Sequence, residues 1–179
     1  MAFNVAEFRA NLLGDGARPN LFQVSLAFPA IANSPIAGQR ITFLAKTAQL
    51  PGSTVGTATV NYFGRELKFA GNRTFPDWSL TIINDEDFNI RNAFERWMDA
   101  LNSHSLNVRN PAAFNQLLYT TDAKVTQFSK TGLPLKTYNF VGLFPTDVAP
   151  IDLDWGTNDT IEEFGVTLAY QYWESDTTS

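Results

Sequence analysis

The sequence predicts a mainly β protein, built as an antiparallel sandwich or a barrel-like fold with a single flanking helix. Several short segments alternate apolar and polar residues with a period of two, which is the pattern of a half-buried strand. Only the segment 85–101 repeats its apolar residues at clear helical spacing. Phenylalanine, which favours strands and buries a large area, occurs 15 times among the 179 residues.

Glycine, proline and asparagine residues divide the chain into short elements. They cluster at 14–20, at 29–40 and across 102–122, so these segments are expected to be loops, the last with a helical turn near 112–118. No internal repeat or linker is evident, which indicates one domain over residues 1–179. In chain order the expected elements are a short helix at 3–13, strands at 22–28 and 41–46, a hairpin at 55–70, a strand at 78–83, the helix at 85–101, a hairpin at 123–144, and strands at 151–155 and 162–173.

The N-terminal segment combines apolar side chains with a position close to the end of the chain. In the helix at 3–13, Phe3, Phe8 and Leu12 fall toward one side. This arrangement suggests docking on a neighbouring molecule. The residues expected to take part in such an interface are Phe3, Phe8, Leu12, Arg18 and Pro19.

Residues 55–70 are expected to form a hairpin with a two-residue turn at Phe63 and Gly64. This turn would pair Tyr62 with Arg65, Val60 with Leu67 and Ala58 with Phe69. Each strand would then have an apolar face and a polar face. The polar face would consist of Thr57, Thr59, Asn61, Glu66 and Lys68.

The second hairpin, at 123–144, turns around residues 131–134 and also sorts into two faces. Val125 lies with Tyr138 and Phe140 on the apolar face. The polar face would consist of Lys124, Thr126, Thr137 and Asn139. Polar faces of this kind suit either an ordinary solvent-facing sheet or a sheet that closes with neighbouring copies into a water-lined barrel.

The helix at 85–101 is expected to begin after Asn84 as its N-cap, with acidic residues 85–87 in the first turn. Its core-facing stripe would consist of Ile90, Phe94, Trp97, Met98 and Leu101. Beyond the second hairpin, Pro145 and Pro150 are expected to bracket a turn. The final strand would present one face made of Phe164, Val166, Leu168, Tyr170 and Tyr172.

Composition excludes most catalytic chemistry. The chain has no cysteine, so it has no disulfide, thiol nucleophile or cysteine-based zinc site, and His104 is its one histidine. No segment approaches the roughly 20 apolar residues that a membrane helix needs. A net charge of −5 is opposite to that of proteins that grip DNA, and like charge repels phosphates. We therefore expect no enzymatic activity and no small-molecule substrate.

The run from Asp152 to Glu163 has the spacing of an EF-hand between its first and last acidic residues. The sixth position of that loop requires glycine, and Thr157 stands there. The flanking residues also alternate like strands rather than helices. A solvated turn is therefore favoured over a metal site, and no cofactor is predicted.

Four blocks of the sequence resemble the tail tube proteins of contractile-tailed bacteriophages, in order and spacing, across nearly the whole chain. The first three blocks are Gly16-Ala17-Arg18-Pro19-Asn20-Leu21-Phe22-Gln23-Val24, Ala70-Gly71-Asn72-Arg73-Thr74-Phe75-Pro76-Asp77-Trp78 and Ile83-Asn84-Asp85-Glu86. The fourth, at the C-terminal end, consists of three separate segments, Gly142-Leu143-Phe144-Pro145-Thr146, Leu153-Asp154-Trp155 and Phe164-Gly165-Val166-Thr167-Leu168-Ala169-Tyr170-Gln171-Tyr172-Trp173. The resemblance implies two packed antiparallel sheets with a flanking helix, and hexameric rings that stack around a lumen. It makes the two polar faces the expected lining of that lumen.

The resemblance also implies partners and a location. The partners would be further copies of the chain, the tail sheath, the baseplate and tail terminator proteins, and, inside the lumen, the tape measure protein and DNA without sequence-specific binding. The protein would be part of the virion tail, assembled in the host cytoplasm. The alternatives are the tube of a type VI secretion or other contractile injection system, a tube-initiating baseplate protein and, less favoured, a monomeric β-sandwich binding module.

Overall fold

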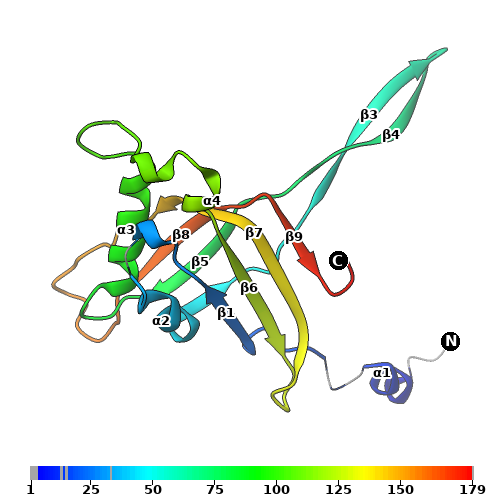
Figure 1. Ribbon diagram of the computed structural model, residues 1–179. Coiled ribbons are helices and arrows are strands. Elements are labelled where there is room, and N and C mark those ends of the chain that lie inside the picture. The colour runs from blue at the N-terminus through cyan, green and yellow to red at the C-terminus, as the bar shows by residue number, and fades with distance from the viewer. Residues whose placement is uncertain (1–3, 13, 15, 33, 179) are drawn as a thin grey trace.

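The computed structural model describes residues 4–12, 14, 16–32 and 34–178 (Figure 1). Apart from the N-terminal helix, the helices lie on one side of a strongly bent sheet, and a long hairpin extends away from it. The elements are α1 Val5–Asn11, β1 Phe22–Leu26, the 3-10 helix Ala30–Ala32, α2 Ala37–Leu44, β2 Ala45–Ala48, β3 Thr54–Tyr62, β4 Arg65–Thr74, β5 Trp78–Ile83, α3 Asn89–Leu101, the 3-10 helix Pro111–Ala113, α4 Gln116–Tyr119, β6 Thr121–Phe128, β7 Pro134–Val148, β8 Glu163–Ala169 and β9 Tyr172–Ser175.

The main sheet is antiparallel and consists of two halves that share β7. Its strand order is β1-β6-β7-β8-β5-β2, and β9 also pairs with β7. The first part of β7 pairs with β6 and β9, whereas its last part pairs with β8. The halves pack face to face, since Trp78 of β5 stacks on Phe140 of β7 with ring centroids 4.2 Å apart. The predicted fold class, mainly β with antiparallel sheets, is confirmed.

The chain passes from one half of the sheet to the other at Gly142. This residue has φ +68°, in the left-handed region that favours glycine. Its N–H donates to Asp122 Oδ1 at 3.0 Å, and the N–H of Gln171 donates to Val141 O at the same distance. On one side of this corner Val141 pairs with Tyr172, and on the other Phe144 pairs with Ala169.

Helix α3 covers the core with aromatic side chains. Phe94 and Trp97 are fully buried, and Phe28, just beyond β1, meets Phe94 edge to face at 4.9 Å. Trp97 Nε1 donates to Tyr119 O at 2.7 Å, which also ties α4 to this helix. Within the described residues, no helix is both long and apolar enough to cross a membrane.

The predicted start of this helix is wrong by several residues. α3 begins at Asn89, and Phe88 precedes it with φ 52°. Asn84 is held elsewhere, because both its backbone N–H and its side chain donate to Glu162. Asp85 and Asp87 lie outside the first turn and bind Arg40 of α2 instead.

The predicted strand at 41–46 is also wrong, since α2 continues to Leu44 and only Ala45–Ala48 form β2. Ile41 and Phe43 suggested alternation, but Ile41 is buried together with Ala37, four residues earlier, on one helical stripe. Phe43 is 83% exposed. The segment 29–40, expected to be a loop, therefore contains the start of a helix.

Three predictions for the C-terminal part of the chain are wrong. Pro145 begins no turn and pairs with Leu168 inside β7, which runs on to Val148. Residues 151–155 form no strand. The predicted final strand breaks near Gln171, so Tyr172 belongs to β9 and is exposed while Phe164, Val166, Leu168 and Tyr170 are buried.

Candidate self-assembly surfaces

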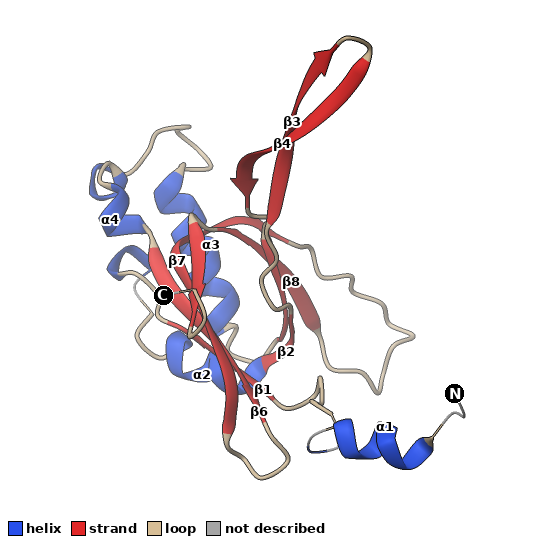
Figure 2. Cartoon of the chain, turned by 90° about the vertical axis from the view of Figure 1, so that its right-hand side faces the viewer, coloured by secondary structure: helices blue, strands red, loops and turns tan. Residues whose placement is uncertain are grey.

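The hairpin of β3 and β4, residues 54–74, stands apart from the rest of the molecule and is called the arm below (Figure 2). Its turn has φ 45° at Phe63 and 79° at Gly64. Positive φ at both central residues is what a two-residue type I′ hairpin turn requires. Tyr62 pairs with Arg65, Val60 with Leu67 and Ala58 with Phe69. The predicted register is therefore confirmed.

Both faces of the arm are exposed. On its apolar face Val60, Tyr62, Leu67 and Phe69 are 43% to 64% exposed, and Phe63 at the tip is 92% exposed. An isolated two-stranded hairpin is marginally stable in water. Large exposed apolar areas mark interaction sites. The arm therefore has the properties of a segment that is covered by another molecule.

The polar face of the arm carries the residues expected from the sequence. Thr59 pairs with Lys68 and Asn61 with Glu66 across the two strands, and Lys68 Nζ lies 3.9 Å from Glu66 Oε1. Thr57 follows the same alternation on β3, opposite Ala70. All these residues are exposed.

A second polar face lies on the outside of the half-sheet β1-β6-β7-β9. Cross-strand pairing places its members in two rows, Gln23 with Thr126 and Thr137, and Ser25 with Lys124, Asn139 and Glu174. The hydroxyls of Thr126 and Thr137 are 3.1 Å apart. One lysine and one glutamate balance each other here, so this face is polar but close to neutral.

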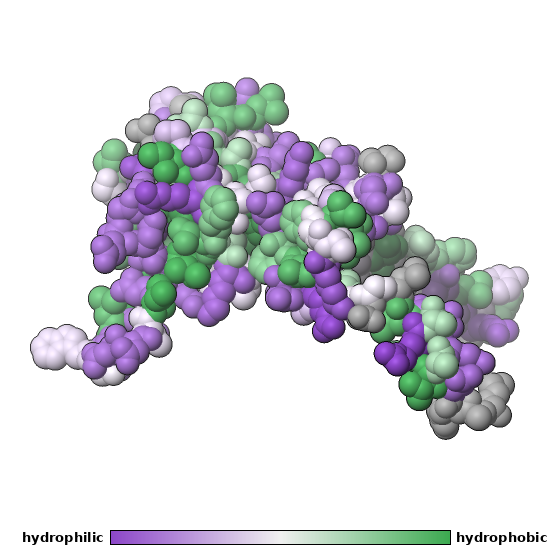
Figure 3. All heavy atoms as spheres, turned by 90° about the horizontal axis from the view of Figure 1, so that it is seen from below, coloured by the Kyte–Doolittle hydropathy of each residue, from purple (hydrophilic) through white to green (hydrophobic). Residues whose placement is uncertain are grey.

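The N-terminal helix α1 extends away from the sheet and buries none of its residues (Figures 1 and 3). Phe8 and Leu12 are exposed, as is Pro19. Arg18 is exposed as well, and its carbonyl accepts a hydrogen bond from Gln127. Phe3 lies outside the described residues.

The predicted stripe on α3 faces the inside of the molecule. Ile90, Phe94 and Trp97 are buried, and Met98 and Leu101 are half-buried. The structure adds Ala93 and Ala100 as buried positions that the sequence reading did not select. Their spacing on the same stripe could have identified them.

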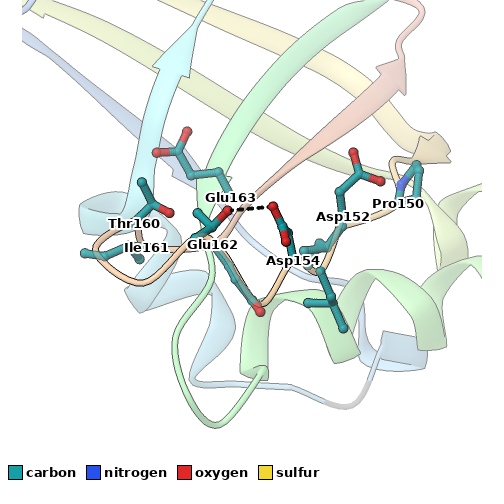
Figure 4. Close-up of a pocket in the computed structure, with 10 residues that line it drawn as sticks. Pro150, Asp152, Asp154, Thr160, Ile161, Glu162 and Glu163 are labelled. Carbon is teal, nitrogen blue, oxygen red and sulfur yellow. Dashed lines mark hydrogen bonds between the residues drawn. The ribbon is translucent and has the colours of Figure 1, made fainter.

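The segment from Pro150 to Glu163, called the acidic loop below, lines a hollow of about 400 Å³ (Figure 4). Asp154 organises it, accepting from the N–H of Gly156 at 2.9 Å and from the hydroxyl of Thr157 at 3.3 Å. Asp152 has no ion pair among the described residues. The described part of the chain contains no group of three or more acidic or histidine side chains placed to hold a metal ion.

The acidic loop also carries apolar side chains and most of the net charge. Trp155 is 100% exposed, Leu153 81% and Ile161 72%. The loop contains five acidic residues and no lysine or arginine. Its charge of −5 therefore equals the net charge of the whole chain. The negative charge is thus local, and the two polar faces do not share it. The sequence reading missed this surface because it assigned residues 151–155 to a strand.

Ion pairs hold the neighbouring segments in place. Arg40 Nη1 lies 2.6 Å from Asp85 and 2.7 Å from Asp87, which ties α2 to the segment before α3. The hydrogen bond from Arg40 lowers the pKa of Asp87, and the same contact raises the pKa of Arg40. His104, the one histidine, binds Asp99 on the surface and lowers the pKa of that carboxyl through this hydrogen bond.

Comparison with solved structures shows where this fold occurs. The chain superposes on a chain of the anti-feeding prophage tube-terminating cap with a TM-score of 0.64 at 18% identity, covering 91% of each chain. It superposes on a chain of the sheath–tube complex of an extracellular contractile injection system with a TM-score of 0.60 at 15% identity, covering 98% of this chain and 99% of the other. The fold is shared with chains of contractile injection assemblies.

Sequence comparison is more specific. Residues 17–176 match the phage tail tube protein family. The chain is 37% identical over 169 residues to tail tube protein gp19 of Enterobacteria phage T4, covering 93% of this chain and 96% of that protein. It is 28% identical over 168 residues to the tail tube protein of Serratia phage KSP90, covering 93% of each. The chain belongs to the phage tail tube protein family, as its sequence blocks predicted.

Proposed function

We propose that this chain is a structural, non-enzymatic subunit of the inner tail tube of a contractile phage, and that it assembles into stacked hexameric rings as one domain over residues 1–179. The arm is the observation that carries this proposal, because its apolar face is exposed in the single chain. An exposed apolar surface of this kind marks a site at which another molecule binds. In a tube, each copy offers the same surface to the next, and a heterologous contact repeats along the assembly.

The two polar faces are proposed to line the lumen. Their residues are Thr57, Thr59, Asn61, Glu66, Lys68, Lys124, Thr126, Thr137 and Asn139. Hydroxyl and amide groups hydrate well. The charges on the two faces, Glu66 and Lys68 on the arm and Lys124 and Glu174 on the half-sheet, are of mixed sign and offer no array of cations to neutralise phosphates. Such a lining would let DNA and the tape measure protein pass without holding them.

The remaining partners are proposed from the relatives. They are the tail sheath around the tube and the baseplate and terminator proteins at its ends, in the virion tail after assembly in the host cytoplasm. The exposed residues Phe8, Leu12, Arg18 and Pro19 are proposed to contact neighbouring copies. α1 supports this assignment, because a seven-residue helix with no buried residue is too short to be stable on its own.

Electron microscopy and sedimentation of the purified protein test the proposal. Rings or tubes are expected over a range of salt and protein concentrations. Monomers under every condition tested would reject it. The monomeric binding-module alternative predicts that outcome, together with a ligand in glycan or peptide screens.

A tube of another contractile injection system is the second candidate function, and the fold shared with such assemblies favours it. Capsid and terminase genes beside the coding sequence are expected for a phage tail, and effector genes for an injection system. A tube-initiating baseplate protein would differ in copy number. Mass spectrometry of purified particles should find many copies per particle for a tube subunit and about one ring for an initiator.

A further inference from the structure

We propose that the arm of one copy docks, through its apolar face and tip, on the acidic loop of a second copy. The inference rests on the proposed function, since it names the two surfaces that meet during self-assembly. Neither surface is completed within its own chain. Each combines exposed apolar side chains with a net charge, which is positive on the arm and negative on the acidic loop.

The arm brings apolar area and positive charge to the contact. Arg65 lies opposite Tyr62 and therefore on the apolar face, next to Phe63 at the tip. Tyr62 and Phe63 meet edge to face with centroids 4.6 Å apart, so the tip is a preformed aromatic pair. Over residues 54–74 the arm has three basic residues and one acidic residue.

The acidic loop offers the complementary surface. Leu153, Trp155 and Ile161 expose most of their area, and Trp155 touches nothing that shields it from solvent. Asp152 and Asp159 have no ion-pair partner in the described part of the chain, so their charge is available to a neighbour. An arginine beside an aromatic tip can pair with a carboxylate and also pack on an indole.

The two surfaces lie on different sides of the molecule. Both views show the arm projecting away from the acidic loop, which is the orange segment at the left of Figure 1 and the long tan loop at the right of Figure 2. A contact within one chain is thus excluded by distance. A contact between two different patches is heterologous, so one copy can bind two others and the chain of contacts can continue.

Cysteine cross-linking tests the contact directly, because the natural chain has no cysteine. Asn61→Cys, beside the tip on the polar face of the arm, and Asn158→Cys in the acidic loop are combined in one chain, so that the apolar side chains of the contact stay in place. Assembled protein is then treated with a short bismaleimide. A ladder of covalent oligomers is expected on a denaturing gel. The control combines Asn61→Cys with Leu133→Cys, whose side chain in the β6–β7 turn is also exposed. Tubes that cross-link only in the control pair, or in neither pair, would overturn the inference.

Charge exchange tests the electrostatic part. Arg65→Asp is expected to raise the critical concentration for tube formation about 30-fold, as loss of an interface anchor does. Adding Asp152→Arg is expected to restore most of the lost assembly, since within the described residues no hydrogen bond of the Asp152 side chain holds the loop. The control is Arg96→Asp, on the exposed side of α3. It makes the same change of charge away from the proposed contact and should have little effect on the critical concentration. The contact would be contradicted if neither Arg65→Asp alone nor Asp152→Arg alone changed the critical concentration for tube formation.

These outcomes separate this inference from the proposed function. If the unaltered protein forms tubes but the cross-link and the charge exchange fail, the tube function stands and the arm binds elsewhere. If the unaltered protein forms no tube, the proposed function itself fails. Trp155→Ala adds a further readout, because its side chain is fully exposed in the single chain. It should weaken assembly and leave the thermal unfolding of the monomer unchanged.

Discussion

Replacement of Gly142 by alanine tests whether the corner in β7 requires glycine. A non-glycine residue in the left-handed region costs about 1–2 kcal/mol. Alanine also lowers the conformational entropy of the unfolded chain, and this offsets about 0.4–1 kcal/mol of that cost. At Gly142 the new Cβ would lie 2.9 Å from Cγ of Gln171, so that side chain must leave its rotamer at a further cost of about 0.5–1.5 kcal/mol. We expect Gly142→Ala to lower the free energy of unfolding by about 2 kcal/mol.

Gly132 provides the matched control. It has φ +81°, and a Cβ there would meet nothing within 4 Å. Gly132→Ala should therefore lose only the backbone contribution, about 1 kcal/mol. Gln171 is exposed, so Gln171→Ala alone should leave the free energy of unfolding nearly unchanged. Combined with Gly142→Ala, it should remove the clash, so that the combination costs no more than Gly132→Ala does.

The assay is urea unfolding followed by tryptophan fluorescence, at protein concentrations where sedimentation detects only monomer. The midpoint should shift while the slope with denaturant stays constant. Equal losses at Gly142 and Gly132, or no recovery in the double variant, would refute the proposed contact with Gln171. A gain in stability from Gly142→Ala would refute the argument about the corner as a whole.

Three further predictions concern the core, pH and the lumen. Phe94→Ala should lower the free energy of unfolding of the monomer by about 3–5 kcal/mol, because Phe94 is fully buried, and denaturant titration measures this loss. Arg40→Ala should destabilise the protein at neutral pH. Because Arg40 lowers the pKa of Asp87 in the folded state, this difference should shrink as pH falls below about 4, where the carboxyl becomes protonated; a pH-independent difference would contradict the role of the ion pair. Thr59→Lys or Thr126→Lys should leave tube formation intact but reduce infectivity, measured by plaque assay, because the added cations would hold phosphates, and unchanged infectivity would reject the assignment of these faces to the lumen.

Local patterns were sufficient to predict most strands. The arm illustrates this, because a two-residue turn and strict alternation fix which residues pair, and the structure contains the expected pairs down to Ala58 and Phe69. The β1 strand and the α3 stripe also follow from periodicity alone. Where a strand period of two and a helical period both fit the same few residues, the predicted element was wrong. At 41–46 two apolar residues fitted a strand, but packing of Ala37 and Ile41 on the core decided for a helix.

The position of the surfaces could not be predicted in the same way. Alternation tells which side chains share a face, but not whether that face packs on the same chain or on another. Alternation in the arm fitted an ordinary solvent-facing sheet as well as a sheet that closes with neighbouring copies, and both faces of the arm are exposed in the single chain. The exposure of Trp155 was equally hidden, because Ile151, Leu153 and Trp155 alternate with Asp152 and Asp154, which is the pattern of a half-buried strand.

The continuity of β7 has a mechanical consequence. Its 15 residues run through both halves of the sheet without a break in the covalent chain. A pull along the tube axis that reached one half would pass to the other through peptide bonds, rather than through the weaker hydrogen bonds between strands. The two halves should consequently resist being sheared apart under such a load, and the point of greatest compliance should be the bend at Gly142.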